Sequence, residues 1–120
     1  MEKMNEKTLR SIVFKTPLGF DYFDYSEIIM IKADCNCSII HSLERDTPVR
    51  ILHNLSYIEE YYCNDHLIRC HKSYIINLMY VEKLLIKSRQ VQMKMNLIVP
   101  LSESCVRKIR QISKVKIHQG

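Results

Sequence analysis

A cluster of hydrogen-bond donors lies in the middle of the chain. It offers a guanidinium, an imidazole, an ammonium and a hydroxyl group within five positions, on Arg69, His71, Lys72 and Ser73. Such a mixture suits phosphate oxygens and the edges of bases. The alternative is that His71 hydrogen-bonds a local turn while the two cations are solvated. Apolar residues flank the cluster on both sides, so we expect two strands to position it.

Cysteine and histidine residues raise the question of a metal site. The candidate ligands are Cys35, Cys37, Cys63, His66, Cys70 and His71. Zinc takes four ligands in a tetrahedral array, and its structural sites favour tight Cys-x-x-Cys pairs that this chain lacks. Neighbours in a strand, such as Cys70 and His71, point to opposite faces. We therefore expect no metal and no cofactor, with the thiols buried as small apolar groups.

Enzymatic chemistry has little support in the sequence. The only glycines are Gly19 and Gly120, so there is no glycine-rich phosphate loop. Neither Gly-x-Ser-x-Gly nor His-Glu-x-x-His is present. We expect a protein that is not an enzyme.

The charge is divided unevenly along the chain. Residues 1–68 carry 7 basic and 11 acidic side chains, whereas residues 69–116 carry 11 basic and 2 acidic ones. A basic half attracts a polyanion, and neutralisation of phosphates is the sequence-independent source of nucleic-acid affinity. A solvated surface, with lysines alternating outward along strands, is the alternative. A membrane surface is a third, which no long basic amphipathic helix supports.

The length of 120 residues predicts one domain, at residues 11–116, with tails at 1–10 and 117–120. No apolar run is long enough to span a bilayer, and the opening residues are polar. We therefore expect a cytoplasmic protein. Five cysteines, an odd number, favour reduced thiols over a complete set of disulfides.

The elements that must position the donor cluster are mainly strands. β-branched and apolar runs predict strands at residues 11–14, 27–32, 38–43, 49–52, 67–70, 74–76, 80–86, 91–95 and 97–101, with a turn at 16–19. One short helix is predicted over 55–62, capped by Asn54 or by Ser56 in a capping box with Glu59. We expect Asn77, between two strands, to hydrogen-bond the local backbone.

A second helix is predicted near the C-terminus. It begins at Ser102 or Ser104, either of which can cap it, and carries Val106, Ile109 and Ile112 on one side. The pattern as a whole predicts a mainly β fold with two short helices.

The donor cluster belongs to a longer motif. Residues 69–77, Arg-Cys-His-Lys-Ser-Tyr-Ile-Ile-Asn, resemble the signature Arg-x-His-[Arg/Lys]-Ser-Tyr-Ile-[Val/Ile]-Asn of the LytTR-type DNA-binding domain of bacterial transcriptional regulators, the LytR/AlgR family. Residues 28–36, 55–62 and 100–102 are similar to other motifs of that family. The resemblance extends over about residues 12–112, and it covers the DNA-binding domain without a phosphoacceptor receiver domain.

The resemblance implies a fold of small stacked antiparallel sheets that reads the major groove of double-stranded DNA with loops. The contact residues that it implies are Asn36, Cys37, Ser38, Arg69, His71, Lys72, Ser73, Ser102 and Glu103. Among these, Lys72 is the expected donor to a base edge or phosphate, with Arg69 and Ser73 on phosphates. Two copies on direct repeats, forming a homodimer on DNA, would suit the family, because one small module buries limited surface.

Two positions depart from the family pattern. Cys37 stands where an aromatic residue is usual, and Glu103 stands where an arginine is common. A carboxylate can accept a hydrogen bond from cytosine N4 but is repelled by phosphate. The alternative function is therefore a protein-interaction or thiol redox-sensing module with weakened DNA binding. Its candidate thiols are Cys70 and Cys105, which neighbouring cations could stabilise as thiolates.

Overall fold

A computed structural model of the chain describes residues 12–119, with side chains described for residues 12–112. The tail expected at residues 1–10 lies outside the described residues. Of the tail expected at 117–120, residues 117–119 belong to helix α3 (Glu103–Gln119), and residue 120 lies outside the described part. None of the described helices is long and apolar enough to cross a membrane.

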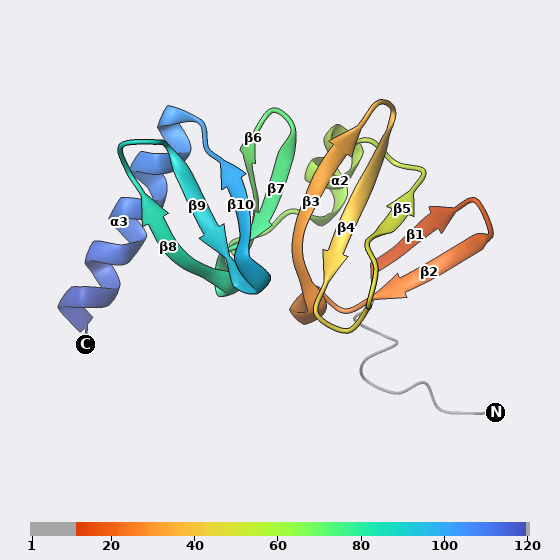
Figure 1. Cartoon of the computed structure of the whole chain (residues 1–120), viewed down its shortest axis with the longest axis horizontal. Coiled ribbons are helices and arrows are strands. Elements are labelled where there is room, and N and C mark those ends of the chain that lie inside the picture. The colour runs from red at the N-terminus through yellow and green to blue at the C-terminus, as the bar shows by residue number, and fades with distance from the viewer. Residues whose placement is uncertain (1–11, 120) are drawn as a thin grey trace.

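Within the described residues, ten strands form three antiparallel sheets (Figure 1). The first sheet pairs β1 (Ile12–Thr16) with β2 (Gly19–Phe23). The second has the order β5 (Val49–Ile51), β4 (Cys37–Ser42), β3 (Ile28–Asp34), β7 (Tyr74–Asn77), β6 (Leu67–His71). The third has the order β10 (Leu97–Pro100), β9 (Gln90–Met93), β8 (Val81–Leu85). The predicted mainly β fold is confirmed.

The five-stranded sheet contributes to two apolar cores. One core joins it to β1, β2 and helix α2 (Leu55–Tyr62), and its fully buried side chains include Phe14, Phe23, Ile31, Ile58 and Ile75. The other joins it to the three-stranded sheet and α3, and its members include Ile29, Ile76, Val91, Val99 and Ile109. Burial of each such side chain stabilises the fold by about 1.5–3 kcal/mol.

The predicted helix over 55–62 is confirmed, and the structure decides how it begins. Asn54 is the N-cap, and its side-chain oxygen accepts a 2.9 Å hydrogen bond from the amide of Tyr57. The capping box expected at Ser56 and Glu59 is wrong. Ser56 lies inside the helix, and both side chains are instead hydrogen-bonded to Arg69.

Strand β2 was not predicted. The turn expected at residues 16–19 is confirmed, and the chain then pairs back along β1, with Thr16 opposite Gly19. Arg45 stabilises the new strand from a distant loop: it donates to Asp21 at 2.9 Å and to the carbonyl of Tyr22 at 2.8 Å. Its guanidinium also lies 4.1 Å from the ring centre of Phe23. These long-range contacts have no local sequence signal.

Asn77 joins two parts of the five-stranded sheet. Its side-chain oxygen accepts from the amide of Met79 at 3.0 Å, which confirms the expected bond to the local backbone. Its amide nitrogen also donates to the carbonyls of Tyr25 and Ile28, at 3.1 and 3.0 Å. Asn77 is buried, so these distant contacts make it a structural residue rather than a surface one.

Candidate nucleic-acid interface

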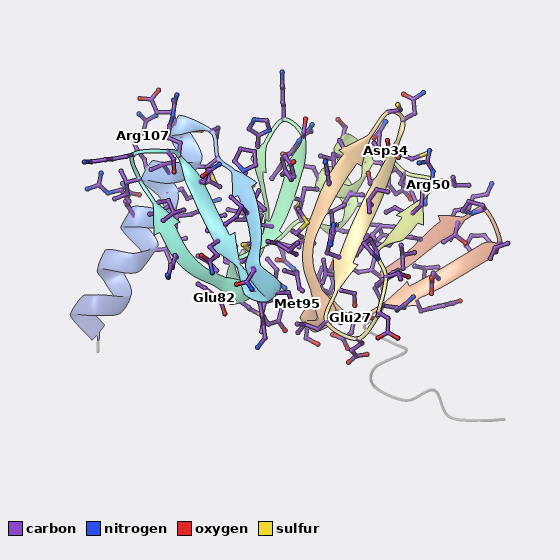
Figure 2. All side chains as sticks on the ribbon, viewed as in Figure 1. Glu27, Asp34, Arg50, Glu82, Met95 and Arg107 are labelled. Carbon is purple, nitrogen blue, oxygen red and sulfur yellow. The ribbon has the colours of Figure 1, made fainter. Side chains whose placement is uncertain are left out.

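Four connections lie along one edge of the molecule (Figure 1). They are the β3–β4 turn at Cys35 and Asn36, the β6–β7 turn at Lys72 and Ser73, the β8–β9 turn at residues 86–89, and the β10–α3 loop at Leu101 and Ser102. We call this surface the turn edge. The opposite edge carries the β9–β10 connection, where Figure 2 labels Met95. The fold thus brings the loops that the family resemblance implies onto one side.

Backbone hydrogen bonds join these connections to one another. The amide of Ala33, next to the β3–β4 turn, donates to the carbonyl of Ser73 in the β6–β7 turn at 2.9 Å. The amide of Ser102 donates to the carbonyl of Cys70 in β6 at 2.8 Å. Backbone amide and carbonyl groups therefore hold the turns in fixed relative positions.

The side chain of Arg69 hydrogen-bonds the backbone of the β6–β7 turn. The guanidinium donates to the carbonyl of Lys72 at 2.7 Å, to the carboxylate of Glu59 at 3.0 Å and to the hydroxyl of Ser56 at 3.3 Å. These bonds occupy Arg69 with protein partners. Lys72 is exposed at the tip of the turn, and no described residue forms an ion pair with it.

His71 is oriented by the residue that ends the same turn. The amide of Ser73 donates to His71 Nδ1 at 3.1 Å, and the imidazole packs edge-on against Tyr74 at 5.7 Å between ring centres. Because Nδ1 accepts, the neutral ring carries its proton on Nε2, which becomes a hydrogen-bond donor. The bond between His71 and its turn, which the sequence offered as the alternative to a binding role, is thus present, and a donor remains for a ligand.

The β3–β4 turn places its three expected contact residues differently. Asn36 is exposed and Cys37 is half-buried, whereas Ser38 is buried and donates its hydroxyl hydrogen to the carbonyl of His53 at 2.7 Å. Ser38 is therefore not brought to the surface with the others. Asp34 and Arg50 form an ion pair beside this turn (Figure 2).

The β10–α3 loop ends in a helix cap. Ser102 Oγ accepts a 3.2 Å hydrogen bond from the amide of Cys105, which identifies Ser102, rather than Ser104, as the capping residue. Glu103 follows in the first turn of α3 and is exposed. The partial positive charge at a helix N-terminus favours a carboxylate at this position.

The β8–β9 turn is not among the contact loops that the family resemblance implies. Its Arg89 is exposed, has a φ of 51°, and accepts a 2.8 Å hydrogen bond from the amide of Leu101 through its carbonyl. This turn, the β6–β7 turn and the start of α3 together enclose an open groove of about 490 Å³, lined by His71, Lys72, Ser88, Arg89, Ser102 and Glu103. The available sequence signal was the polar run at residues 87–90 between two strands of the basic half.

Cys70 and Cys105, the candidate thiols of the redox alternative, are buried, as expected of small apolar groups. Burial raises the pKa of Cys70 to about 12, and burial likewise raises the pKa of Cys105. Both thiols are therefore neutral near pH 7, because burial outweighs the opposite effect of Lys108 on the pKa of Cys105. The side chains described for residues 12–112 contain no group of three or more His, Cys, Asp or Glu arranged to hold a metal ion.

The fold and the turn edge define a small β-sheet module for binding nucleic acid. The chain belongs to the LytTR family, since the model of the LytTr DNA-binding domain matches residues 21–114. Its structure is similar to that of a LytTr DNA-binding domain from Bacillus cereus, with a TM-score of 0.69 and 20% sequence identity over 86% of this chain and 95% of that one. No curated protein matches the chain.

The family resemblance found in the sequence is confirmed by this match. The structural likeness, at 20% identity, shows the shared fold. LytTR domains are DNA-binding domains, so DNA binding in transcription regulation is the general function of the chain, and the family is not one of enzymes.

Proposed function

We propose that the chain binds double-stranded DNA sequence-specifically, with the turn edge in the major groove, and regulates transcription in bacteria. The observation that carries the proposal is the hydrogen-bonded alignment of the four connections along one edge. A rigid row of short turns can bind a groove without a recognition helix. Its polar groups already hold their relative positions, so little free energy is spent on ordering them during binding.

Different side chains of the turn edge suit different contacts. Lys72, exposed and without an ion-pair partner among the described residues, is the strongest candidate for a phosphate or a base edge. His71 Nε2 and the exposed amide of Asn36 supply further donors. Arg69, occupied by Glu59 and the Lys72 carbonyl, acts by positioning the turn.

Two copies on direct repeats remain part of the proposal. One small DNA-binding module buries roughly 600–1,000 Å² of protein surface. Tandem binding multiplies affinity without any new type of contact, because the second copy binds at a raised local concentration. A homodimer on DNA is the expected complex.

The test is DNA affinity as a function of salt concentration for the wild type, Lys72→Ala and Lys94→Ala. Lys94 is the matched control, because it is also exposed but lies in the β9–β10 connection on the opposite edge. Lys72→Ala should weaken binding while Lys94→Ala changes it little. If Lys72→Ala weakens binding to all sequences and makes the affinity less dependent on salt, Lys72 contacts a phosphate. If the binding free energy falls by about 1–3 kcal/mol only for one base at one position, Lys72 recognises that base. A wild type without salt-dependent DNA binding would refute the proposal.

A protein-interaction module is the second candidate, and one surface favours it. The β1–β2 hairpin exposes Leu18, Phe20 and Tyr22, at 101%, 69% and 55% of their full accessible area. Exposed apolar groups gathered in this way are typical of contact surfaces between proteins. Retention of DNA binding by a Phe20→Ser variant, together with loss in Lys72→Ala, would assign DNA binding to the turn edge alone.

A further inference from the structure

Glu103 lies in the wall of the groove at the turn edge, where the start of helix α3 favours its carboxylate but DNA phosphates would not. Its side chain is exposed in the first turn of α3, and it forms no ion pair with any described residue. A carboxylate facing a phosphate would be repelled by it. The same carboxylate facing a base that presents only a donor would be attracted.

Two cations share the groove with Glu103. Lys72 and Arg89 line it from the β6–β7 and β8–β9 turns. Arg89 is held by its backbone, because its amide donates to the carbonyl of Ile86 at 3.2 Å and its carbonyl accepts from Leu101 at 2.8 Å. Neither cation forms an ion pair with Glu103 within the described residues, so all three charges are available to a ligand.

The chemistry of the major groove decides what such an arrangement recognises. Guanine presents two acceptors there and thymine one, and both repel a carboxylate. Adenine places an acceptor beside its amino donor, whereas cytosine presents only the N4 amino group. A single carboxylate flanked by cations is therefore complementary to cytosine with its neighbouring phosphates.

We infer that Glu103 reads a cytosine in the major groove, accepting from N4, while Lys72 and Arg89 neutralise the adjacent phosphates. This inference rests on the proposed function and names the base that the groove selects. It also explains how a negative side chain fits a DNA-binding edge: the two cations from neighbouring turns offset its repulsion from the backbone.

Selection from a library of randomised duplexes tests the inference, with the whole chain and Glu103 variants. The wild type should require cytosine at one position of each half-site, with roughly five- to 150-fold discrimination, as expected for one specific contact. Glu103→Ala should remove this preference and leave the other positions unchanged. Glu103→Gln should move the preference towards adenine, since a carboxamide both donates and accepts.

Arg89 gives an independent test with a different readout. Arg89→Ala should weaken binding to all sequences and reduce the salt slope by about one, while the cytosine preference persists. Lys94→Ala, on the opposite edge, is the matched control and should change neither quantity. An Arg89→Ala variant with the salt slope of Lys94→Ala would overturn the role given to Arg89.

The two proposals fail in different ways. If the wild type shows no salt-dependent DNA binding, the proposed function is wrong. If the wild type selects a motif that Glu103→Ala leaves unchanged, the function stands and the cytosine contact is wrong. A Glu103→Ala variant that tightens binding to every sequence equally would also overturn the inference, because the carboxylate would then act by repulsion alone.

Discussion

The guanidinium of Arg69 donates a 2.7 Å hydrogen bond to the carbonyl oxygen of Lys72, three residues further along the chain. A second bond from the same group, to Glu59 at 3.0 Å, ties the β6–β7 turn to helix α2. Arg69 was expected to hold a phosphate. The structure gives it protein partners on both sides, so we propose that it contributes to DNA binding through the shape of the turn.

Arg69→Ala should therefore affect stability as well as DNA binding. Hydrogen bonds to charged groups contribute about 1.5–3 kcal/mol, and partial exposure of this pair reduces the expected loss to about 1 kcal/mol of unfolding free energy. Lys72→Ala, at the exposed tip, should change stability by less than about 0.5 kcal/mol. Urea titrations followed by circular dichroism measure both. Unchanged stability in Arg69→Ala, with a salt slope reduced as in Lys72→Ala, would show Arg69 to be a phosphate ligand.

Asn77→Ala should be more damaging than any substitution at the turn edge. It removes partners from the carbonyls of Tyr25 and Ile28 and from the amide of Met79, in a buried position. The expected cost is about 2–3 kcal/mol of unfolding free energy, from urea titration. Asn64→Ala is the control, because the Asn64 side chain also bonds the backbone, accepting from the amides of His66 and Leu67, but is exposed. An equal loss of unfolding free energy in the two variants would show that burial does not add to the stabilisation by Asn77.

Stability should fall as the pH is lowered through the histidine range. Burial, with Lys15 nearby, lowers the pKa of His53, and burial, with Lys32 nearby, lowers the pKa of His41. Folded protein then binds fewer protons than unfolded protein, so stability is highest above the ordinary histidine pKa of 6.5 and decreases below it.

Protonation of His53 also removes an acceptor. His53 Nε2 accepts from the amide of Lys15 at 3.1 Å, and a protonated ring cannot keep this bond. Urea titrations near pH 7 and at about pH 5.5 should show lower stability at the acidic value, with a smaller difference in His53→Gln. The same unfolding free energy at both values would contradict this prediction.

The five cysteines should differ widely in reactivity. Cys35 is exposed at the tip of the β3–β4 turn, whereas burial raises the pKa of Cys63 to about 11 and that of Cys70 to about 12. The thiolate is the reactive form, so an aromatic disulfide reagent near pH 8 should label Cys35 rapidly and Cys70 only after unfolding. Mass spectrometry of timed samples identifies the labelled residues, with urea-unfolded protein as control. Labelling of Cys70 at the rate of Cys35 would show that this core opens readily.

Local patterns in the sequence were enough to predict most of the elements. Runs of β-branched and apolar residues predicted the strands of the two larger sheets. Alternation of apolar with polar residues added the strand at 91–95, since a strand that buries one face repeats every second residue. Helix α2 followed from its apolar spacing and from Asn54 as one candidate cap. The family could be identified because its signature at residues 69–77 is one uninterrupted strand–turn–strand segment.

Only the tertiary structure decided what individual side chains do. Strand β2 depends on Arg45, which is 24 residues from its partner Asp21, and the groove at the turn edge exists because the amide of Leu101 reaches the carbonyl of Arg89. Ser38 and Asn36 are two residues apart, yet one is buried and the other exposed. A residue's neighbours in the chain establish its secondary structure through their backbone preferences and the spacing of their apolar side chains. Its partners and exposure come from segments that are distant in the chain and meet only when the sheets pack.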